Sequence, residues 1–202
     1  MRSLLALVAA AVTALFLSSC TSPASDGHTD HEHGGESSSA AAADASTTNN
    51  AADVTFVTGM IPHHEQAVRM SSMVPQRSTN PAVIKLAADI SAAQGPEIDT
   101  MKAWLAQWTG GNDAGGAHDG HDMGAMDGMV DDATMTKLET LKGADFDDLW
   151  LRSMIGHHEG AIKMANTEIA EGANVDAKKL ATQIVTAQQA EIDQMKKMVG
   201  QA

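Results

Sequence analysis

Residues 60–70 read MIPHHEQAVRM, and residues 154–164 read MIGHHEGAIKM. A second block follows each of them at the same distance: ISAAQGPEIDTMK occupies 90–102, and IVTAQQAEIDQMK occupies 184–196. No residue has been inserted or deleted between the two blocks of either copy. The chain therefore contains an internal duplication, and the repeated residues include His, Met and Glu, which are all potential metal ligands.

Composition and periodicity favour helices in both copies. The chain of 202 residues has no Tyr and 3% aromatic residues, whereas Ala, Met, Leu, Glu, Gln and Lys are plentiful. This balance is typical of helical proteins rather than sandwiches or barrels. Apolar residues also recur with the helical period. We expect four main helices within residues 51–200, at about 53–74, 81–108, 145–172 and 175–199.

The signals that start helices are repeated as well. Asn80 is a good N-cap and Pro81 suits the first helical position, and Asn174 takes the equivalent place in the second copy. A single helical hairpin cannot cover the apolar faces of both its helices. We therefore predict an all-α fold, a four-helix bundle made of two duplicated hairpins, with repeats at 53–108 and 147–199.

The first residues have the pattern of a targeting segment. Arg2 precedes an apolar run that ends in LSSC at Cys20, the only cysteine of the chain. This ending resembles a bacterial lipobox, in which the cysteine is lipidated and becomes the mature first residue. We expect residues 1–19 to be a lipoprotein signal peptide and Cys20 to anchor an exported protein to the outer face of the cell membrane. The alternative is an ordinary signal peptide with a chance cysteine.

Residues 20–50 are rich in small and polar residues and contain almost no large apolar side chains. Such a segment cannot bury a core, so we expect a flexible tether. It contains His28, His31 and His33. A short histidine cluster can bind divalent metal loosely, and the alternative is a solvated linker that happens to contain histidine.

Residues 109–133 form a Gly- and Asp-rich loop that is longer than most connections in compact domains. Large hydrophobic residues are scarce there, so burial does not explain its methionines. We expect this loop to recruit metal, and the alternative is compositional drift in a linker. Its candidate ligands are His118, His121, Met123, Met126 and Met129.

The chain is acidic, with a formal net charge of -13 at pH 7. Binding to nucleic acid requires a basic face, so we do not expect nucleic acid as a partner. An acidic surface attracts cations, although acidity can also serve only to keep an exported protein soluble.

The doubled histidines are the centre of the candidate site. On a helical wheel, His64 falls near the middle of the apolar face of the first helix, and His63 falls near its edge. A buried imidazole needs a partner for each ring nitrogen. Nearby polar residues could fill this role structurally, or they could orient histidine on a metal. These candidates are Gln94 and Glu97 in the first copy and Gln188 and Glu191 in the second.

Methionines recur at matching places: Met60, Met70 and Met101 in the first copy, and Met154, Met164 and Met195 in the second. A methionine stripe alone is usually core filler. Here the methionines accompany duplicated histidines and are echoed in the loop. Thioether and imidazole ligands suit copper, especially Cu(I).

These motifs resemble the bacterial family known as domain of unknown function 305. The resemblance covers roughly residues 53–199 and rests on the MIPHH block, the later Gln-x-x-Glu-Ile block and their duplication. It implies a ferritin-like four-helix bundle, and some family members are exported copper-binding proteins linked to copper tolerance. By motif, it makes His63, His64, His157, His158 and the motif methionines the candidate ligands. Gly156 replaces Pro62 in the second copy, so the two copies need not match in shape.

Three functions are consistent with these observations. The leading hypothesis is an extracytoplasmic lipoprotein that binds copper and sequesters it or hands it to a partner protein. The second is a di-iron or di-copper oxidase, which we disfavour because no Glu stands three residues before a motif histidine, as di-iron bundles require. The third is a metal-free interaction module whose His, Gln and Glu side chains form a buried polar network. We therefore do not expect an enzyme.

Overall fold

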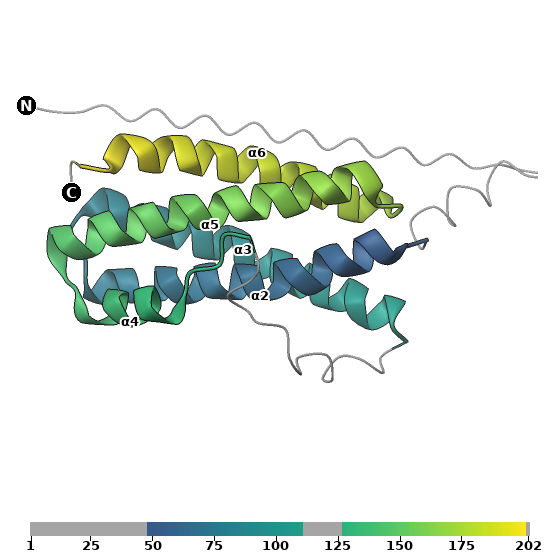
Figure 1. Ribbon diagram of the computed structural model, residues 1–202, viewed down its shortest axis with the longest axis horizontal. Coiled ribbons are helices and arrows are strands. Elements are labelled where there is room, and N and C mark those ends of the chain that lie inside the picture. Colours follow the sequence, from purple (N-terminus) through teal and green to yellow (C-terminus); the bar gives the residue numbers. More distant parts are fainter. Residues whose placement is uncertain (1–47, 111–126, 201–202) are drawn as a thin grey trace, which may run out of the picture. The chain divides into compact units, whose positions relative to one another are not determined.

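The computed structural model describes residues 48–110 and 127–200, which form helices joined by turns. In chain order these are α2 (Ala51–Met73), the 3-10 helix η1 (Val74–Gln76), α3 (Pro81–Trp108), α4 (Asp132–Thr140), α5 (Gly143–Glu171) and α6 (Val175–Met198) (Figure 1). No strand occurs within these two ranges, so the all-α prediction is confirmed. None of the helices in them has both the length and the apolar character needed to cross a membrane.

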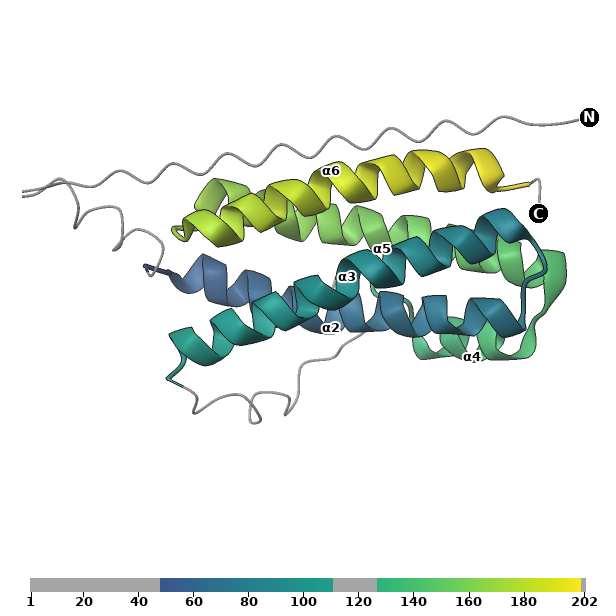
Figure 2. The same cartoon turned by 180° about the vertical axis from the view of Figure 1, so that it is seen from behind.

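The four long helices form two hairpins. α3 folds back along α2, and α6 folds back along α5 (Figure 1, Figure 2). The hairpins meet through α2 and α5, so each of these two central helices packs against its hairpin partner and against the other central helix. The predicted bundle of two duplicated hairpins is confirmed.

Several sequence predictions concern residues outside the described ranges. These are the signal peptide, the lipidation of Cys20, the tether histidines His28, His31 and His33, and the loop residues His118, His121, Met123 and Met126. They remain predictions.

The predicted N-caps form. The side chain of Asn80 accepts a hydrogen bond from the backbone N–H of Ala82 (3.0 Å), and Asn174 accepts from Asp176 (3.1 Å) and Ala177 (2.9 Å). The first helix begins two residues earlier than expected, because Asn50 caps it. Asn50 belongs to the segment that we predicted as tether, and only its hydrogen bonds distinguish it from the polar residues before it.

Asp53 ties the start of α2 to the turn between α5 and α6. Its carboxylate accepts hydrogen bonds from the backbone N–H groups of Asn50 (2.6 Å) and Asn174 (2.9 Å) and, with both oxygens, from that of Ala173 (3.1 and 3.2 Å). Asp53 is buried, as is Glu168 beside the same turn. Burial, and then the neighbouring Asp53, raise the pKa of Glu168 to about 8. The hydrogen bonds of Asp53 to Ala173 and Asn174 join the two hairpins at one end of the bundle.

The short helix α4 was not predicted. Asp131 caps it by accepting from the backbone N–H of Thr134 at 2.8 Å. Met135 and Leu138, one turn apart, are buried against the bundle. The helix has only 9 residues, which is too few for its apolar periodicity to distinguish it from a polar loop. It is followed by α5, which starts at Gly143 in the left-handed region (φ 60°) rather than near Asp145.

The apolar core is divided into two clusters, and each draws residues from both hairpins. One surrounds Trp150, whose indole N–H donates to the carbonyl of Met70 (3.1 Å), and we call it the Trp150 cluster. The other contains Phe56 and is called the Phe56 cluster. The motif methionines are shared between them across the repeats. Met70, Met154 and Met195 belong to the Trp150 cluster, and Met60 and Met101, with Met164 at the margin, belong to the Phe56 cluster.

Candidate metal centre

A layer of polar side chains lies between the two clusters. On α2, His63 and His64 fall between Ile61 of the Phe56 cluster and Ala67 of the Trp150 cluster. The equivalent histidines of α5 are placed in the same way. The exposed fraction is 0% for His63, His64 and His158 and 1% for His157. The full polar layer comprises His63, His64, Gln94, Glu97, His157, His158, Gln188 and Glu191.

His63 and His157, which we call the inner histidines, face each other across the two central helices. Their ring centroids are 3.7 Å apart and the rings are tilted by 38°. The prediction that His63 lies at the edge of a buried face is therefore wrong. A helical wheel treats the helix as covered from one side, whereas α2 is covered by both α3 and α5, which widens its buried sector.

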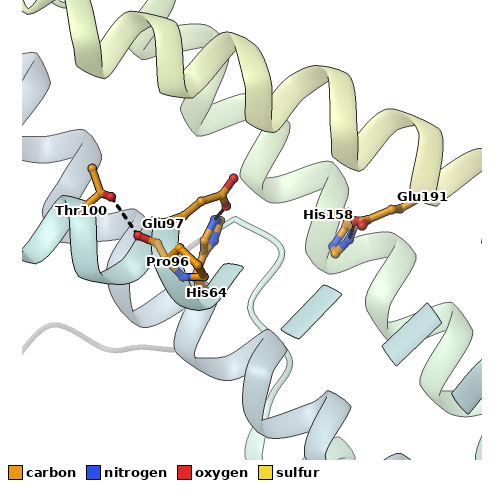
Figure 3. A network of polar contacts seen from close by, with 6 residues as sticks. All are labelled: His64, Pro96, Glu97, Thr100, His158 and Glu191. Atoms are coloured by element: carbon orange, nitrogen blue, oxygen red, sulfur yellow. Dashed lines mark hydrogen bonds and ion pairs between the residues drawn. The ribbon is translucent and has the colours of Figure 1, made fainter. Parts of the chain in front are cut away.

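His64 and His158, the outer histidines, each bind a glutamate from the neighbouring helix of their own hairpin. The distance from Nε2 to the glutamate Oε2 is 2.9 Å for His64 and Glu97 and 2.7 Å for His158 and Glu191 (Figure 3). The glutamate side chains are 22% and 18% exposed, so they link the buried rings to solvent. Since a carboxylate only accepts, Nε2–H donates, and in a neutral outer histidine the lone pair is then on Nδ1.

The remaining ring nitrogens have no hydrogen-bond partner among the described residues. These are the Nδ1 atoms of the outer histidines and both nitrogens of each inner histidine. Gln94 and Gln188, which we considered as partners for the rings, do not bond to them, and the side-chain amide of Gln94 is itself unpaired. An unpaired buried polar group costs about 1–3 kcal/mol. Such a concentration of unpaired nitrogens is typical of a site that binds a ligand.

Burial keeps the inner histidines neutral. Desolvation, and then the charge of His64, lower the pKa of His63 to about 3, although the backbone of Asp127 acts in the opposite direction. Desolvation, and then the charges of His63 and the outer histidines, hold the pKa of His157 well below its usual range. Neutral imidazole is the form that binds metal, so these two rings present lone pairs at physiological pH.

In the conformation shown, no three His, Cys, Asp or Glu side chains of the described residues are arranged to hold a metal ion. The polar layer therefore supplies donors rather than a finished coordination shell. Five motif methionines are fully buried in the clusters on either side of this layer: Met60, Met70, Met101, Met154 and Met195. Of the loop ligands, Met129 lies within the described residues, where it is half-buried.

Sequence reasoning missed the segment that covers this centre. The side-chain amide of Gln66 binds the backbone of Val130, donating to its carbonyl and accepting from its N–H at 2.8 Å each. On a helical wheel Gln66 falls opposite the apolar face of α2, so the wheel does not predict this contact. The only signal in the sequence was that Gln66 and its repeat equivalent Gly160 differ within an otherwise similar motif.

Comparisons with known proteins identify the family and show solved structures with the same fold. Residues 53–199 match the family model described as domain of unknown function (DUF305). A stretch of 53 residues is 40% identical to the "Uncharacterized protein L153" of Acanthamoeba polyphaga mimivirus. That match covers 26% of this chain and 35% of the viral protein, so the chain spans about a third of the length of that relative.

Solved structures of two proteins share the fold at similar identity. The putative secreted DUF305 protein from Streptomyces coelicolor is 34% identical with a TM-score of 0.66, covering 74% of this chain and 93% of its own. CopM in its Cu(II)-bound form is also 34% identical, with a TM-score of 0.61, covering 73% and 95%. CopM is also known in a Cu(I)-bound form, which is 32% identical with a TM-score of 0.59 over 72% of this chain and 93% of its own.

Proposed function

The chain belongs to the family described as domain of unknown function 305, and on that premise we propose that it is an extracytoplasmic lipoprotein that binds copper for sequestration, tolerance or transfer. The ligands are the four histidines of the polar layer, joined by motif methionines. The partners are the metal ion, a membrane reached through lipidated Cys20, and a protein that receives copper.

One observation carries the proposal: the buried inner histidines leave all their ring nitrogens without hydrogen-bond partners among the described residues. Copper would use these lone pairs and remove the cost of leaving them unpaired. Ring rotation is needed to aim them at one ion, and the Glu97 and Glu191 contacts would hold the outer rings while the inner rings move. CopM, which shares the fold, is known with Cu(I) and with Cu(II).

The same proposal gives roles to the segments outside the bundle. Loop residues His118, His121, Met123 and Met126 would capture ions at the surface, and Met129 lies where the loop joins the bundle. Export is supported by the signal-like first 19 residues and by the likeness to a protein described as secreted.

Binding fits the centre better than catalysis. Di-iron bundles use Glu-x-x-His pairs, whereas Met60, Ile61, Met154 and Ile155 stand three residues before the motif histidines. The main competing function is a metal-free interaction module. Its support is that Glu97 and Glu191 already provide hydrogen-bond partners for the outer histidines. Metal analysis of protein purified under native conditions, without added copper, separates the two.

Copper titration of the folded mature chain at pH 7.5 tests the ligands. The His63→Leu/His157→Leu variant fills the space of the inner rings without their nitrogens, and should lose the copper equivalents held by the bundle. Deletion of 112–126 should remove only the copper held by the loop. If the double leucine variant binds as wild type and the deletion abolishes binding, the histidines of the bundle are structural and the loop holds the metal.

The methionines have their own control. Met60→Leu/Met154→Leu should weaken Cu(I) binding, because a thioether is a soft ligand and leucine is not. Met135→Leu replaces a buried methionine that lies outside the repeated motifs and should bind as wild type. Equal losses in both variants would show that the effect comes from packing rather than from ligation.

A further inference from the structure

A four-residue segment, Asp127–Val130, crosses the bundle beside the histidines, and we call it the strap. It reaches α2 at Gln66, two residues after His64 along the chain. There the Gln66 amide bonds to both the N–H and the carbonyl of Val130, at 2.8 Å each. One side chain thereby satisfies both backbone groups of the strap residue, as a paired strand would.

On its other side the strap rests directly on the backbone of α5. A Cβ on Gly160 would overlap the carbonyl of Asp127 and lie 2.7 Å from the Cα of Gly128. A Cβ on Gly128 would lie 2.7 Å from the carbonyl oxygen of Gly156 and 2.9 Å from that of His157. Gly128 also has a φ of 83°, which favours glycine. The strap and the helix therefore approach so closely that neither glycine can carry a side chain.

Both contacts are made at the level of the inner histidines. Gly156 and Gly160 bracket His157 and His158 along α5. The inner rings are essentially without solvent exposure.

The strap uses one position of the repeat in two ways. Gln66 and Gly160 are equivalent residues, yet the first holds the strap by hydrogen bonds and the second makes room for it. A single chain segment that crosses a pseudo-symmetric pair of helices must break their symmetry. The strap thus accounts for the difference between the two copies at this position.

The outer margin of the strap is weakly held. The Asp127 carboxylate lies 3.7 Å from the Lys163 ammonium, and these side chains are 65% and 68% exposed. Exposed ion pairs contribute little. Opening the strap on the α2 side therefore breaks two neutral hydrogen bonds and the contact of the half-buried Val130 with the Trp150 cluster, whereas opening the bundle itself would disrupt both apolar clusters.

We propose that the strap gates the histidine centre, so that soft metal ions reach the inner histidines when the Gln66–Val130 bonds open. This inference rests on the copper-binding function proposed above, which identifies the metal ion. It predicts that access to the inner rings is set by the strap and not by unfolding of the helices.

The test is chemical access to the rings in the metal-free, full mature chain. Diethyl pyrocarbonate acylates neutral imidazole, and peptide mass spectrometry follows the His63 and His157 peptides. Gln66→Ala removes both bonds and should speed acylation about tenfold, the factor expected from losing two neutral hydrogen bonds. Gly160→Ala forces the strap off α5 and should have an effect in the same direction. Gly156→Ala is the matched control, one turn away on the same helix, where a Cβ meets nothing within 4 Å.

The variants should also release bound Cu(I) to a chelator faster than wild type, with unchanged helix content by circular dichroism. Acylation at the wild-type rate in folded Gln66→Ala would overturn the gate, even if Gly160→Ala fails to fold. Faster acylation with unchanged copper release would also overturn it, because ions would then take another path. A different result would contradict the copper-binding proposal itself: the His63→Leu/His157→Leu variant would bind copper as wild type does.

Discussion

The two copies of the repeat agree in their histidine–glutamate contacts and differ at their ends. At the centre, each copy has a buried outer histidine bound to a glutamate, at 2.9 Å in the first and 2.7 Å in the second. Each also has an exposed lysine–glutamate pair beside it, Lys102–Glu65 and Lys196–Glu159. The polar layer is thus retained in both copies down to individual contacts.

The ends follow a different rule. Asp53 accepts four hydrogen bonds from three backbone N–H groups, whereas its repeat equivalent Asp147 is buried with an Oδ1 that has no partner among the described residues. Glu168, with a raised pKa, corresponds to the apolar Val74 in the other copy. Duplication therefore preserved the site and left the joints between hairpins free to diverge. Each difference can be used as an internal control.

The largest effect is expected at the two aspartates. Asp53→Ala leaves the N–H groups of Ala173 and Asn174 without their acceptor and removes part of the Asn50 cap, which should cost about 2–4 kcal/mol of unfolding free energy. Asp147→Ala should cost less than ~1 kcal/mol, because one of its buried oxygens makes no bond to lose. Urea unfolding of the two variants side by side measures the difference. Equal losses would show that Asp147 has a partner in solution.

The inner and outer histidines should respond differently to leucine. His63→Ala should cost about 2–4 kcal/mol, since it leaves a cavity in a fully buried site. His63→Leu should cost less than ~1 kcal/mol in metal-free protein, because it fills the space and breaks no hydrogen bond. His64→Leu removes the partner of Glu97 and should cost more than His63→Leu. If the order of these two is reversed, the inner ring nitrogens are bonded in solution.

Glu168 gives one copy a pH dependence that the other lacks. Its pKa is about 8 in the folded chain against 4.5 for an ordinary glutamate, so the folded state favours the protonated form. Stability is therefore full below about pH 4.5 and falls as the pH rises toward 8. Glu168→Gln should abolish this fall and raise the stability at pH 8, because an amide stays neutral and needs no proton to remain buried. Thermal unfolding at pH 5 and pH 8 measures it, with the exposed Glu171→Gln as control.

The smallest effect is expected at the surface pairs. Lys102→Ala and Lys196→Ala each break an exposed ion pair, at 2.6 Å and 3.3 Å, and each should cost ~0.5 kcal/mol or less. The two losses should agree within error and shrink with added salt. A clearly larger loss at Lys102 would mean that the shorter distance reflects a specific structural role.

The long helices, the caps at Asn80 and Asn174 and the histidine–glutamate pairing follow from the sequence, because each depends on residues with a strong local signal that occurs twice. Asn80 and Asn174 mark helix starts by their own chemistry. The inner position of His63 does not follow, since it depends on α5 covering a second side of α2. The strap does not follow either: a short polar segment has no periodicity, and Gln66 finds its partner far along the chain. Tertiary contacts decided each of these.

The division of the core has a consequence for how the chain is assembled. Met70 of the first hairpin completes the cluster around Trp150 of the second, and Met60 shares its cluster with Ala161 of the second. Neither hairpin has an apolar core of its own. The two hairpins are therefore comparable to the subunits of an obligate heterodimer that are linked in one chain. Cutting the chain within 111–126 should give two peptides that stay unstructured alone and regain helix when mixed. During synthesis the apolar faces of the first hairpin should therefore stay exposed to water until the second hairpin, through the end of α6, has been made.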